Sequence, residues 1–589
     1  MRATLAALCI ASMLVAGCAS VGAREGEMPG GIALDGLAVA DHLSDTTHEV
    51  LSMLAIQGDC EREAAACARA VIETPGTVRE ATRLLAAADL LHRGSQRGVR
   101  PVQLALDCAR HTERYLFAEN LEGRKSALDA RSQLALRLHD ACTSKLVNEV
   151  PFDRAEPIRW RWRTDDARFP RADVQRVVLA AGVRTQGLRT RQVDDGLGVA
   201  AVAIGQAKGM PMFPPQPFAL AINVRYVRDA TGESLEVTDA SSHQRIDTAL
   251  GRVDLARDTT AAYALSAALF DEELNAWGGL RRPEAMVTSE LRLLAPIDAE
   301  KTPLVLVHGF ASSPVAWANF ANEVLGDPEL ADRYQVWLAR YWTGPPLLAN
   351  RYALARGIGT LRDAHVSGGG DPSLVIVGHS MGGVLARLLV TDPGMALWNA
   401  TFAKPPGALG VSPEDEALAQ EVFLFKPVPD IDTVVFISTP HGGSEAADGV
   451  VARLLRGLVE SSAQAIGLLK RIATGAPDAI QPALQPVFAA GGPNSLDTLS
   501  PRNPVHRAAR GLPIVPGVEA WSLIGIVDPD HPERGDGVVP LESQAWPGAK
   551  EVRIRGDHHL QAEPATVAAL KRILLDRLAR MPPRTGPRE

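Results

Sequence analysis

The sequence predicts a multidomain protein whose C-terminal half is an α/β domain with a mostly parallel sheet, preceded by an all-α region and a β-rich region. Two runs of four apolar residues, 304–307 and 374–377, are typical of strands buried on both faces of a parallel sheet. The second run leads through a glycine-rich turn into an apolar helical stretch at 384–390. The chain of 589 residues is long enough for roughly two to four domains.

The composition narrows the class of protein. Hydrophobic residues make up 46% and charged residues 22%, which are ordinary values for a globular protein and exclude a disordered or collagen-like chain. A net charge of −8 gives no strong phosphate-seeking surface, so nucleic acid is not an expected partner. No apolar run reaches the roughly 20 residues that span a bilayer. Membrane contact is therefore expected from an anchor.

The first residues supply a candidate anchor. Arg2 precedes a short apolar segment at 5–15, and Val-Ala-Gly-Cys at 15–18 resembles the lipobox of bacterial lipoproteins. The resemblance implies that residues 1–17 are a signal peptide and that the thiol of Cys18 is acylated, with 18–35 as a linker to the first domain. Several acyl chains give stable membrane attachment where one is marginal. The alternative is an ordinary secretory signal with a chance cysteine.

The residue after the lipobox bears on sorting. Ala19 stands where an aspartate is associated with inner-membrane retention in Gram-negative lipoproteins. The pattern therefore favours a lipid anchor at the cell envelope, in the outer membrane of a Gram-negative cell.

Four cysteines remain after Cys9 leaves with the signal and Cys18 takes lipid. They lie close together in the sequence in a part of the chain that folds outside the cytoplasm, which predicts two disulfides with three possible connectivities. No metal-binding spacing accompanies them, and buried free thiols are the alternative. The four are Cys60, Cys67, Cys108 and Cys142.

Two regions precede the α/β domain. Residues 36–150 are rich in Ala and Leu at helical spacing, with turn signals at 74–76 and 98–101, and predict about four or five helices packed as hairpins. This helical domain stabilises the protein or binds a partner protein. Residues 151–295 predict a β-rich module that packs against the next domain. Its β-prone runs are 176–181, 199–204, 218–227 and 286–294.

A nucleophilic serine is predicted at the turn after the second apolar run. The segment at 378–383 reads Gly-His-Ser-Met-Gly-Gly, with Ser380 between strand and helix. Small residues on both sides permit the strained elbow that exposes a serine oxygen, and the helix N-terminus behind it favours developing negative charge. The first apolar run ends in a comparable way at His308-Gly309-Phe310. The alternative is an inert glycine-rich turn between strand and helix.

A serine nucleophile needs a base and an acid that orients the base. Asp536 follows a strand-like run at 520–527, and the adjacent His558 and His559 follow another at 551–555, before a closing helix at 564–580. Where a nucleophilic serine lies in such a turn between strand and helix, the catalytic residues follow one another along the chain in the order Ser, Asp or Glu, His. Spacing alone does not separate the two histidines. His441 is a third candidate base, but it precedes the acid and so comes in the wrong order.

These motifs together resemble the α/β-hydrolase-fold lipases and esterases, most closely bacterial serine esterases related in pattern to inositol-deacylase-type lipases. The resemblance covers roughly 295–580 and includes Ser-Thr-Pro-His-Gly-Gly-Ser at 438–444. It implies a catalytic domain at 296–589 with a helical cap inserted at about 444–512. The implied roles are nucleophile for Ser380, acid for Asp536, base for His558 by its interval to Pro564, and oxyanion hole for the backbone amides of Phe310 and Met381.

The expected activity is cleavage of lipophilic carboxylic esters by a Ser-His-Asp acyl-enzyme mechanism, with no cofactor and no metal. Asp528, Asp530 and Asp557 are interpreted as solvated turn residues rather than as acid substitutes or calcium ligands. His308 and His379 are interpreted as supports for two segments: 308–310 (the oxyanion loop) and the turn at Ser380 (the elbow). Two alternatives stay open: a non-catalytic envelope scaffold with a relic hydrolase domain, and an acyltransferase or thioesterase that uses the same triad.

Overall fold

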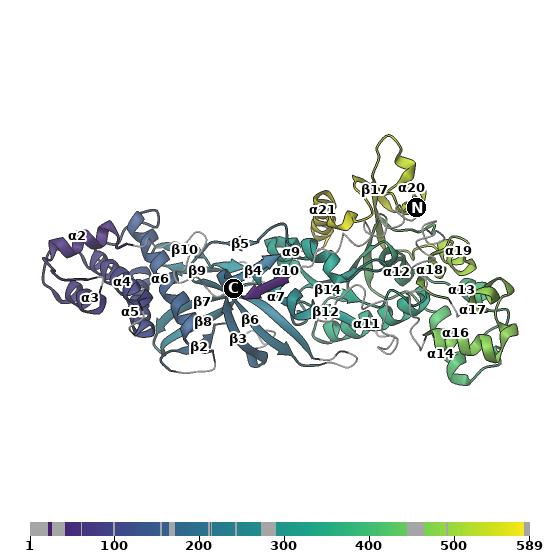
Figure 1. Cartoon of the computed structure of the whole chain (residues 1–589), viewed down its shortest axis with the longest axis horizontal. Coiled ribbons are helices and arrows are strands. Elements are labelled where there is room, and N and C mark those ends of the chain that lie inside the picture. Colours follow the sequence, from purple (N-terminus) through teal and green to yellow (C-terminus); the bar gives the residue numbers. More distant parts are fainter. Residues whose placement is uncertain are drawn as a thin grey trace, which may run out of the picture. The chain divides into compact units, whose positions relative to one another are not determined.

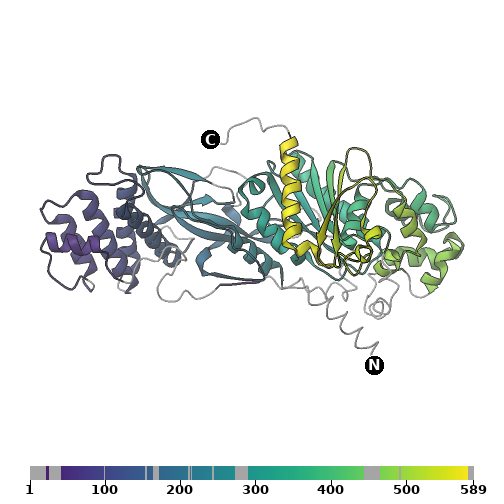
Figure 2. The ribbon, with the colours of Figure 1, turned by 90° about the horizontal axis from the view of Figure 1, so that it is seen from above.

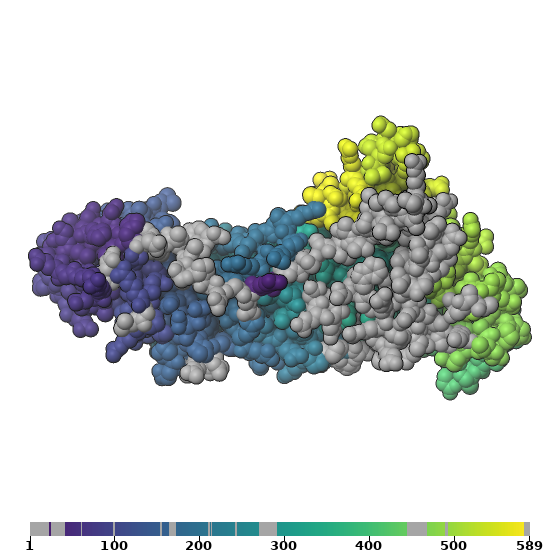
Figure 3. Space-filling model, viewed as in Figure 1, coloured from purple at the N-terminus to yellow at the C-terminus, as the bar shows by residue number. Residues whose placement is uncertain are grey.

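The computed structural model describes residues 22–25, 42–60, 62–97, 100–152, 156–163, 171–209, 213, 215–241, 244–271, 290–443, 465–489 and 493–581 (Figures 1 and 2). It divides into two compact units. The N-terminal unit comprises Gly22–Lys208 and Pro217–Leu269, and the C-terminal unit includes Gly209–Gln216 and Phe270–Glu589. Both units are visible in the space-filling view (Figure 3). The predicted signal peptide and Cys18 lie outside the described residues.

After strand β1 (Gly22–Glu25), which lies in the segment 18–35 expected to be a linker, five helices follow in the N-terminal unit, in agreement with the predicted helical region. Local sequence explains several of their ends: the Ser44 side chain accepts a hydrogen bond from the Thr47 amide at the start of the first helix, and Pro101 begins the fourth, where its missing N–H costs nothing. The helices are α2 (Asp45–Met53), α3 (Ala64–Glu73), α4 (Glu80–Gln96), α5 (Pro101–Phe117) and α6 (Ala130–Glu149).

Two disulfides connect this helical region, as predicted. Cys60–Cys67 closes a short loop into α3, and Cys108–Cys142 joins α5 to α6. This is one of the three connectivities that the sequence left open. By the chain-entropy account, a bridge across the 34 residues between Cys108 and Cys142 removes roughly 4 kcal/mol of freedom from the unfolded chain.

A five-stranded sheet completes the N-terminal unit, in the order β2-β8-β7-β6-β3. One core cluster unites Leu85 of α4 and Leu146 of α6 with Ile222 and Leu235 of the sheet, so the helical and β-rich regions share their hydrophobic core. A second cluster packs α7 (Thr259–Asp271) against Val202 and neighbouring sheet residues. The strands are β2 (Arg159–Trp162), β3 (Val174–Leu179), β6 (Val199–Ala207), β7 (Gln216–Asp229) and β8 (Gly232–Asp239).

Short strand pairs flank this sheet. β1 pairs antiparallel with β4, β9 with β10, and β5 with β11. These strands are β1 (Gly22–Glu25), β4 (Val183–Gln186), β5 (Val193–Asp194), β9 (Arg245–Thr248), β10 (Gly251–Asp254) and β11 (Arg257–Asp258).

The C-terminal unit contains the predicted mostly parallel sheet, with seven strands in the order β12-β14-β13-β15-β16-β17-β18. Every neighbouring pair is parallel except β12 with β14. β12 lies in the run 286–294, which was expected to belong to the β-rich module; the described part of this run instead forms an edge of the seven-stranded sheet. The strands are β12 (Glu290–Leu293), β13 (Thr302–Val307), β14 (Tyr334–Arg340), β15 (Leu374–His379), β16 (Ile431–Ile437), β17 (Glu519–Ile526) and β18 (Lys550–Arg555).

The strand order places helices on both faces of this sheet. From β13 the chain crosses to β14 in one direction, and from β15 it crosses to β16 in the other. Because such crossovers are right-handed, α9 after β13 and α12 after β15 lie on opposite faces. The helices of this unit outside the insertion are α9 (Ala318–Gly326), α10 (Pro328–Arg333), α11 (Leu347–Ser367), α12 (Met381–Leu389), α13 (Ala396–Thr401), α14 (Pro413–Phe423), α20 (Leu541–Gln544) and α21 (Pro564–Arg580).

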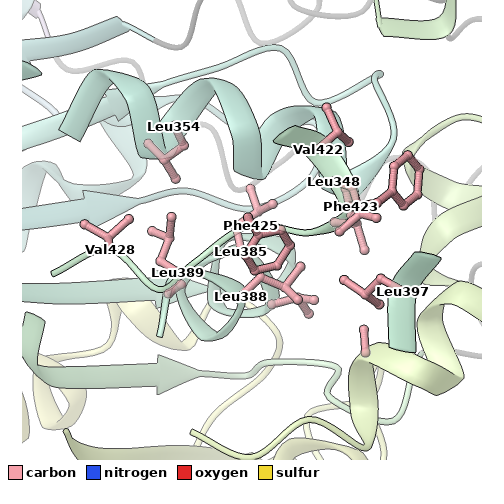
Figure 4. Close-up of a cluster of buried hydrophobic side chains, with 14 of the residues drawn as sticks. Leu348, Leu354, Leu385, Leu388, Leu389, Leu397, Val422, Phe423, Phe425 and Val428 are labelled. Atoms are coloured by element: carbon pink, nitrogen blue, oxygen red, sulfur yellow. The ribbon is translucent and has the colours of Figure 1, made fainter. Parts of the chain in front are cut away.

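A cluster of leucines shows how α12 is held (Figure 4). Leu385, Leu388 and Leu389 of α12 are buried together with side chains of α11, α14 and the segment that leads to β16. Beyond the sheet, the predicted cap insertion contains helices in its described part, while residues 444–464 lie outside it. These are α16 (Ala465–Gly475), α17 (Gln485–Ala489), α18 (Ser495–Leu499) and α19 (Pro504–Arg510). Within the described residues, none of the helices has the length and apolar character needed to cross a membrane.

Asp140 of α6 yields a pH prediction. Its buried carboxylate accepts a hydrogen bond from the Gly198 amide at 2.7 Å and contacts His139 Nδ1 at 3.3 Å. Burial raises the pKa of Asp140 from 3.8 to about 6, against the opposing effect of these contacts. A raised carboxyl pKa means that the folded state binds the extra proton, so this group costs stability above pH 6 and the cost disappears as the pH falls towards 4.

We therefore expect Asp140→Asn to raise the free energy of unfolding relative to wild type at pH 8 by up to about 2 kcal/mol more than at pH 4.5. Urea unfolding at the two pH values measures the difference. An identical effect of the substitution at both values would contradict the assignment.

Candidate active site

Ser380 lies in a tight turn between β15 and α12, at the carboxyl edge of the sheet. Its φ is 54° and its ψ is −124°, a conformation that L residues adopt only under strain. The flanking glycines make the turn possible: a Cβ on Gly382 would lie 2.4 Å from the carbonyl oxygens of Val307 and His308. The serine therefore sits where α12 presses directly against the end of β13.

The position matches a topological property of the sheet. β13 and β15 are neighbours, and the chain leaves them in opposite directions across the sheet. In open α/β sheets such a switch point opens a crevice at the carboxyl ends of the strands. His308-Gly309-Phe310 follows β13 and Ser380 follows β15, so both predicted segments border this crevice.

The structure brings together the three side chains predicted as nucleophile, base and acid. Nε2 of His558 lies 2.9 Å from Oγ of Ser380, and Nδ1 of His558 lies 2.8 Å from Oδ2 of Asp536. Because a carboxylate only accepts hydrogen bonds, Nδ1 carries the proton and Nε2 is free to accept the serine hydroxyl.

Asp536 is fixed and charged by its own loop. Its Oδ1 accepts the amides of Val538 at 2.9 Å and Val539 at 2.7 Å. Burial raises the pKa of Asp536, but the hydrogen bonds from His558 and from these two amides outweigh it, and the pKa lies below its ordinary value. The carboxylate is therefore ionised at neutral pH and holds the imidazole in one tautomer.

The other candidate bases lie apart from this group. His559 is about one-third exposed, and its backbone amide donates to Asp557 Oδ1 at 2.8 Å. The ring of His441 is buried between Phe436 and Trp546, and burial holds its pKa well below the ordinary range. In the described part of the chain, neither ring forms a hydrogen bond to Ser380 or Asp536.

The predicted turn aspartates form local contacts. Asp557 accepts the His559 amide, and Asp528 accepts the Asp530 amide at 3.1 Å, as short polar side chains in turns commonly do. Over the described ranges there is no group of three or more His, Cys, Asp or Glu side chains that could hold a metal ion.

The two predicted oxyanion donors border the serine. A Cβ on Gly309 would lie 3.0 Å from Ser380 Cβ, so the backbone leading into Phe310 passes directly beside the nucleophile. Met381 begins α12, where the first amides of a helix have no partner within it. Across the described residues, neither the Phe310 nor the Met381 amide donates to a protein acceptor. Both N–H groups are thus available to a developing oxyanion.

Residues outside the predicted motifs hold these loops. Tyr341 stacks on His308 with ring centroids 4.5 Å apart and donates its hydroxyl to the His308 carbonyl. Burial lowers the pKa of His308 to about 4, so it stays neutral as part of this support. The Thr343 hydroxyl accepts the Ala311 amide at 3.2 Å. Gln544 forms hydrogen bonds to the backbone of Gly525 and Val539. These residues lie before and after Asp536 in the chain, so Gln544 fixes the loop that carries the acid (the acid loop).

An apolar cavity of about 460 Å³ lies beside the inserted helices. Its walls come from the first half of α11, from α14 and from the helices α16, α17 and α19, and the triad side chains are not among them. It nevertheless approaches the oxyanion loop along the chain: Thr343, which holds Ala311, is three residues from Pro346 in the cavity wall. Leu348, Leu388, Val422 and Phe423 of the wall appear in Figure 4.

A comparison with known protein families agrees with this architecture. Residues 304–570 match the model of the Alpha/beta hydrolase family, so the C-terminal unit contains an α/β-hydrolase domain. No curated protein matches the sequence.

Solved structures resemble about half of the chain. A Bacillus licheniformis lipase in mature form shares 15% identity, covering 48% of this chain and 97% of its own, with a TM-score of 0.30. Lipase 1 from Pelosinus fermentans shares 13% identity over 48% of this chain and 100% of its own, with a TM-score of 0.30. An esterase from Thermogutta terrifontis, butyrate bound, shares 16% identity over 53% and 96%, with a TM-score of 0.28.

The adjacent histidines give the prediction that this geometry makes most directly. His558→Ala removes the group between Ser380 and Asp536, so we expect ester hydrolysis to fall by several orders of magnitude. His559→Ala is the matched control, because it removes a neighbouring imidazole without touching either partner, and it should keep most of the turnover. Steady-state kinetics on p-nitrophenyl esters measure both. The opposite pattern would transfer the role of base to His559, and two active variants would point to His441.

Proposed function

We propose that this protein is a serine hydrolase that cleaves carboxylic esters of lipophilic compounds. One observation carries the proposal: the unbroken series of hydrogen bonds from Asp536 through His558 to Ser380, with distances of 2.8 and 2.9 Å. An activated nucleophile requires a base within hydrogen-bond reach and a third group that orients the base. The turn at Ser380 and the two available amides provide the remaining parts of acyl-transfer chemistry.

The proposed reaction has two steps. Ser380 Oγ attacks the ester carbonyl while Nε2 of His558 takes its proton, and the negative charge on the carbonyl oxygen is met by the amides of Phe310 and Met381. The imidazolium then protonates the departing alkoxide. The alcohol dissociates, and the acyl group remains bound to Ser380 Oγ as an acyl-enzyme. Water attacks this ester in the same way and releases the acid. A single oxyanion donor is typically worth about 3 to 4 kcal/mol of the barrier.

The cavity beside the inserted helices supports a lipophilic substrate. Its walls are mainly aliphatic and aromatic, and its volume of about 460 Å³ falls in the range of sites that hold small molecules. Burial of an aliphatic chain there gains roughly 0.8 kcal/mol for each CH2 group. We propose that this cavity receives the acyl chain of the ester, and that the chain runs from Ser380 to the cavity along the segment between Thr343 and Leu347.

Two other functions use the same parts. A non-catalytic scaffold would not need a strained serine, an ionised acid and an oriented base within hydrogen-bond distance of one another. These three features together favour an enzyme. An acyltransferase or thioesterase would use the same triad and differ in the acceptor or the leaving group. The inositol-deacylase type of lipase stays a prediction from the motifs of the sequence.

The proposed location is the cell envelope, with the chain anchored by lipid on Cys18. The support is the lipobox pattern of the sequence. The N-terminal unit is proposed to stabilise the protein or to bind a partner protein.

Ser380→Ala tests the proposed activity. The substitution removes one oxygen at a partly exposed position and should leave the thermal unfolding midpoint nearly unchanged, while ester hydrolysis falls by several orders of magnitude. A series of p-nitrophenyl esters of increasing acyl length measures the activity and the preference for lipophilic chains. Wild-type turnover in this variant would remove the proposal, and so would a folded wild-type protein that hydrolyses none of the esters.

Cys18→Ser tests the anchor. If the thiol is acylated, the variant should leave the membrane fraction and lose incorporation of a fatty-acid label, because serine offers no thiol for the lipid. Ser380→Ala is a suitable control, since it should fractionate with wild type. Unchanged fractionation of Cys18→Ser would show that another part of the chain holds the protein at the membrane.

A further inference from the structure

His379 connects the nucleophile to the loop after β18 that carries the base, His558 (the base loop). It is the last residue of β15 and directly precedes Ser380. Its side chain is buried, with 5% of the residue exposed, and its Nε2 lies 2.7 Å from the backbone carbonyl oxygen of His558. The rings of His379 and His558 are 5.2 Å apart and tilted by 50°. The contact joins residues that are 179 positions apart in the chain.

The hydrogen-bond partner fixes the tautomer of His379. A carbonyl oxygen only accepts, so Nε2 carries the proton and Nδ1 has a lone pair. Nδ1 has no hydrogen-bond partner among the described residues, and it lies 3.1 Å from the place where a Cβ on Gly309 would sit. One imidazole therefore contacts the elbow, the base loop and the oxyanion loop.

The charge state of His379 suits this position. Burial lowers its pKa to about 3, with the charge of His558 acting in the same direction and the hydrogen bond to the His558 carbonyl acting against it. The other titratable neighbours are His559, which lowers the pKa of His379, and Asp536, which raises it. His379 is neutral at every pH where a histidine base works, so no second cation opposes the imidazolium that forms on His558.

The base loop needs such a connection. It follows β18, the edge strand of the sheet, whose residues are mostly exposed. Within the loop, Gly556 donates its amide to Ile526 of β17 and His559 donates to Asp557. The hydrogen bond from His379 instead ties the backbone of the base itself to the central strand that ends in the nucleophile. A misplacement of about 1 Å between reacting groups can cost on the order of 100-fold in rate.

We propose that His379 is a positioning residue, whose Nε2–H sets the place of His558 relative to Ser380 by binding the main-chain oxygen of the base. The proposal rests on the proposed function, because it assigns His379 a role in that reaction. It differs from a packing role in one respect: what matters is a donor at the Nε2 position rather than the volume of the ring.

Three substitutions in the full chain separate these roles. His379→Gln places an amide N–H near the Nε2 position, His379→Asn carries the same group on a shorter side chain that does not reach the carbonyl, and His379→Phe keeps the ring without a donor. A fluorophosphonate titrates the reactive Ser380 in each preparation, so that turnover refers to folded sites. The kinetics use a p-nitrophenyl ester of short acyl length.

We expect His379→Phe and His379→Asn to lower kcat per reactive site by about 10- to 100-fold with little change in KM, and His379→Gln to stay within about 5-fold of wild type.

The outcomes distinguish the two proposals. Wild-type kcat in His379→Phe or His379→Asn would overturn the positioning role, as would equal losses in His379→Asn and His379→Gln. If His379→Phe does not fold, the contrast between the Asn and Gln variants decides alone. A folded wild-type protein without fluorophosphonate labelling at Ser380 and without ester hydrolysis would instead contradict the proposed function.

Discussion

The close approach of α12 to the end of β13 is the constraint on which the site depends. At Gly382 the backbone of the helix lies against the carbonyl oxygens of Val307 and His308, where even a Cβ would not fit. This contact holds Ser380 at a positive φ, and it brings the loop after β13 beside the serine. Strain of this kind persists only where the surrounding structure determines it, and here the surrounding structure is the fully buried centre of a parallel sheet.

The remaining parts of the site are arranged by neighbouring strands. The acid loop follows β17 and the base loop follows β18, so that both reach the crevice from the same side of β15. Polar contacts then fix each loop separately: two backbone amides hold Asp536, Tyr341 and Thr343 hold the oxyanion loop, and His379 holds the base loop. Burial keeps His308 and His379 neutral, which leaves His558 as the group that changes charge in the proposed mechanism.

Much of this arrangement could be predicted from the sequence, for physical reasons. Strands such as β13 and β15 are buried on both faces and therefore appear as continuous apolar runs. The elbow needs small residues at fixed offsets from Ser380. Chain order favours a base that follows Asp536, as His558 and His559 do, over His441, which precedes it. The roles of Tyr341, Thr343 and Gln544 could not be predicted, because each depends on a contact between residues distant in sequence. The disulfide pairing and the place of β12 depended on tertiary structure in the same way.

The reactivity of Ser380 towards a fluorophosphonate tests the central claim most directly, because the reagent forms a covalent bond only with an activated serine and requires no knowledge of the natural substrate. The measurement is the rate of labelling, with mass spectrometry to locate the label, in wild type and in Asp536→Asn. The account predicts labelling at Ser380 alone. It also predicts a rate lower by orders of magnitude in Asp536→Asn, since an amide would favour the tautomer in which Nε2 cannot take the serine proton. Labelling at another residue, or a rate that does not change when Asp536 loses its charge, would contradict it.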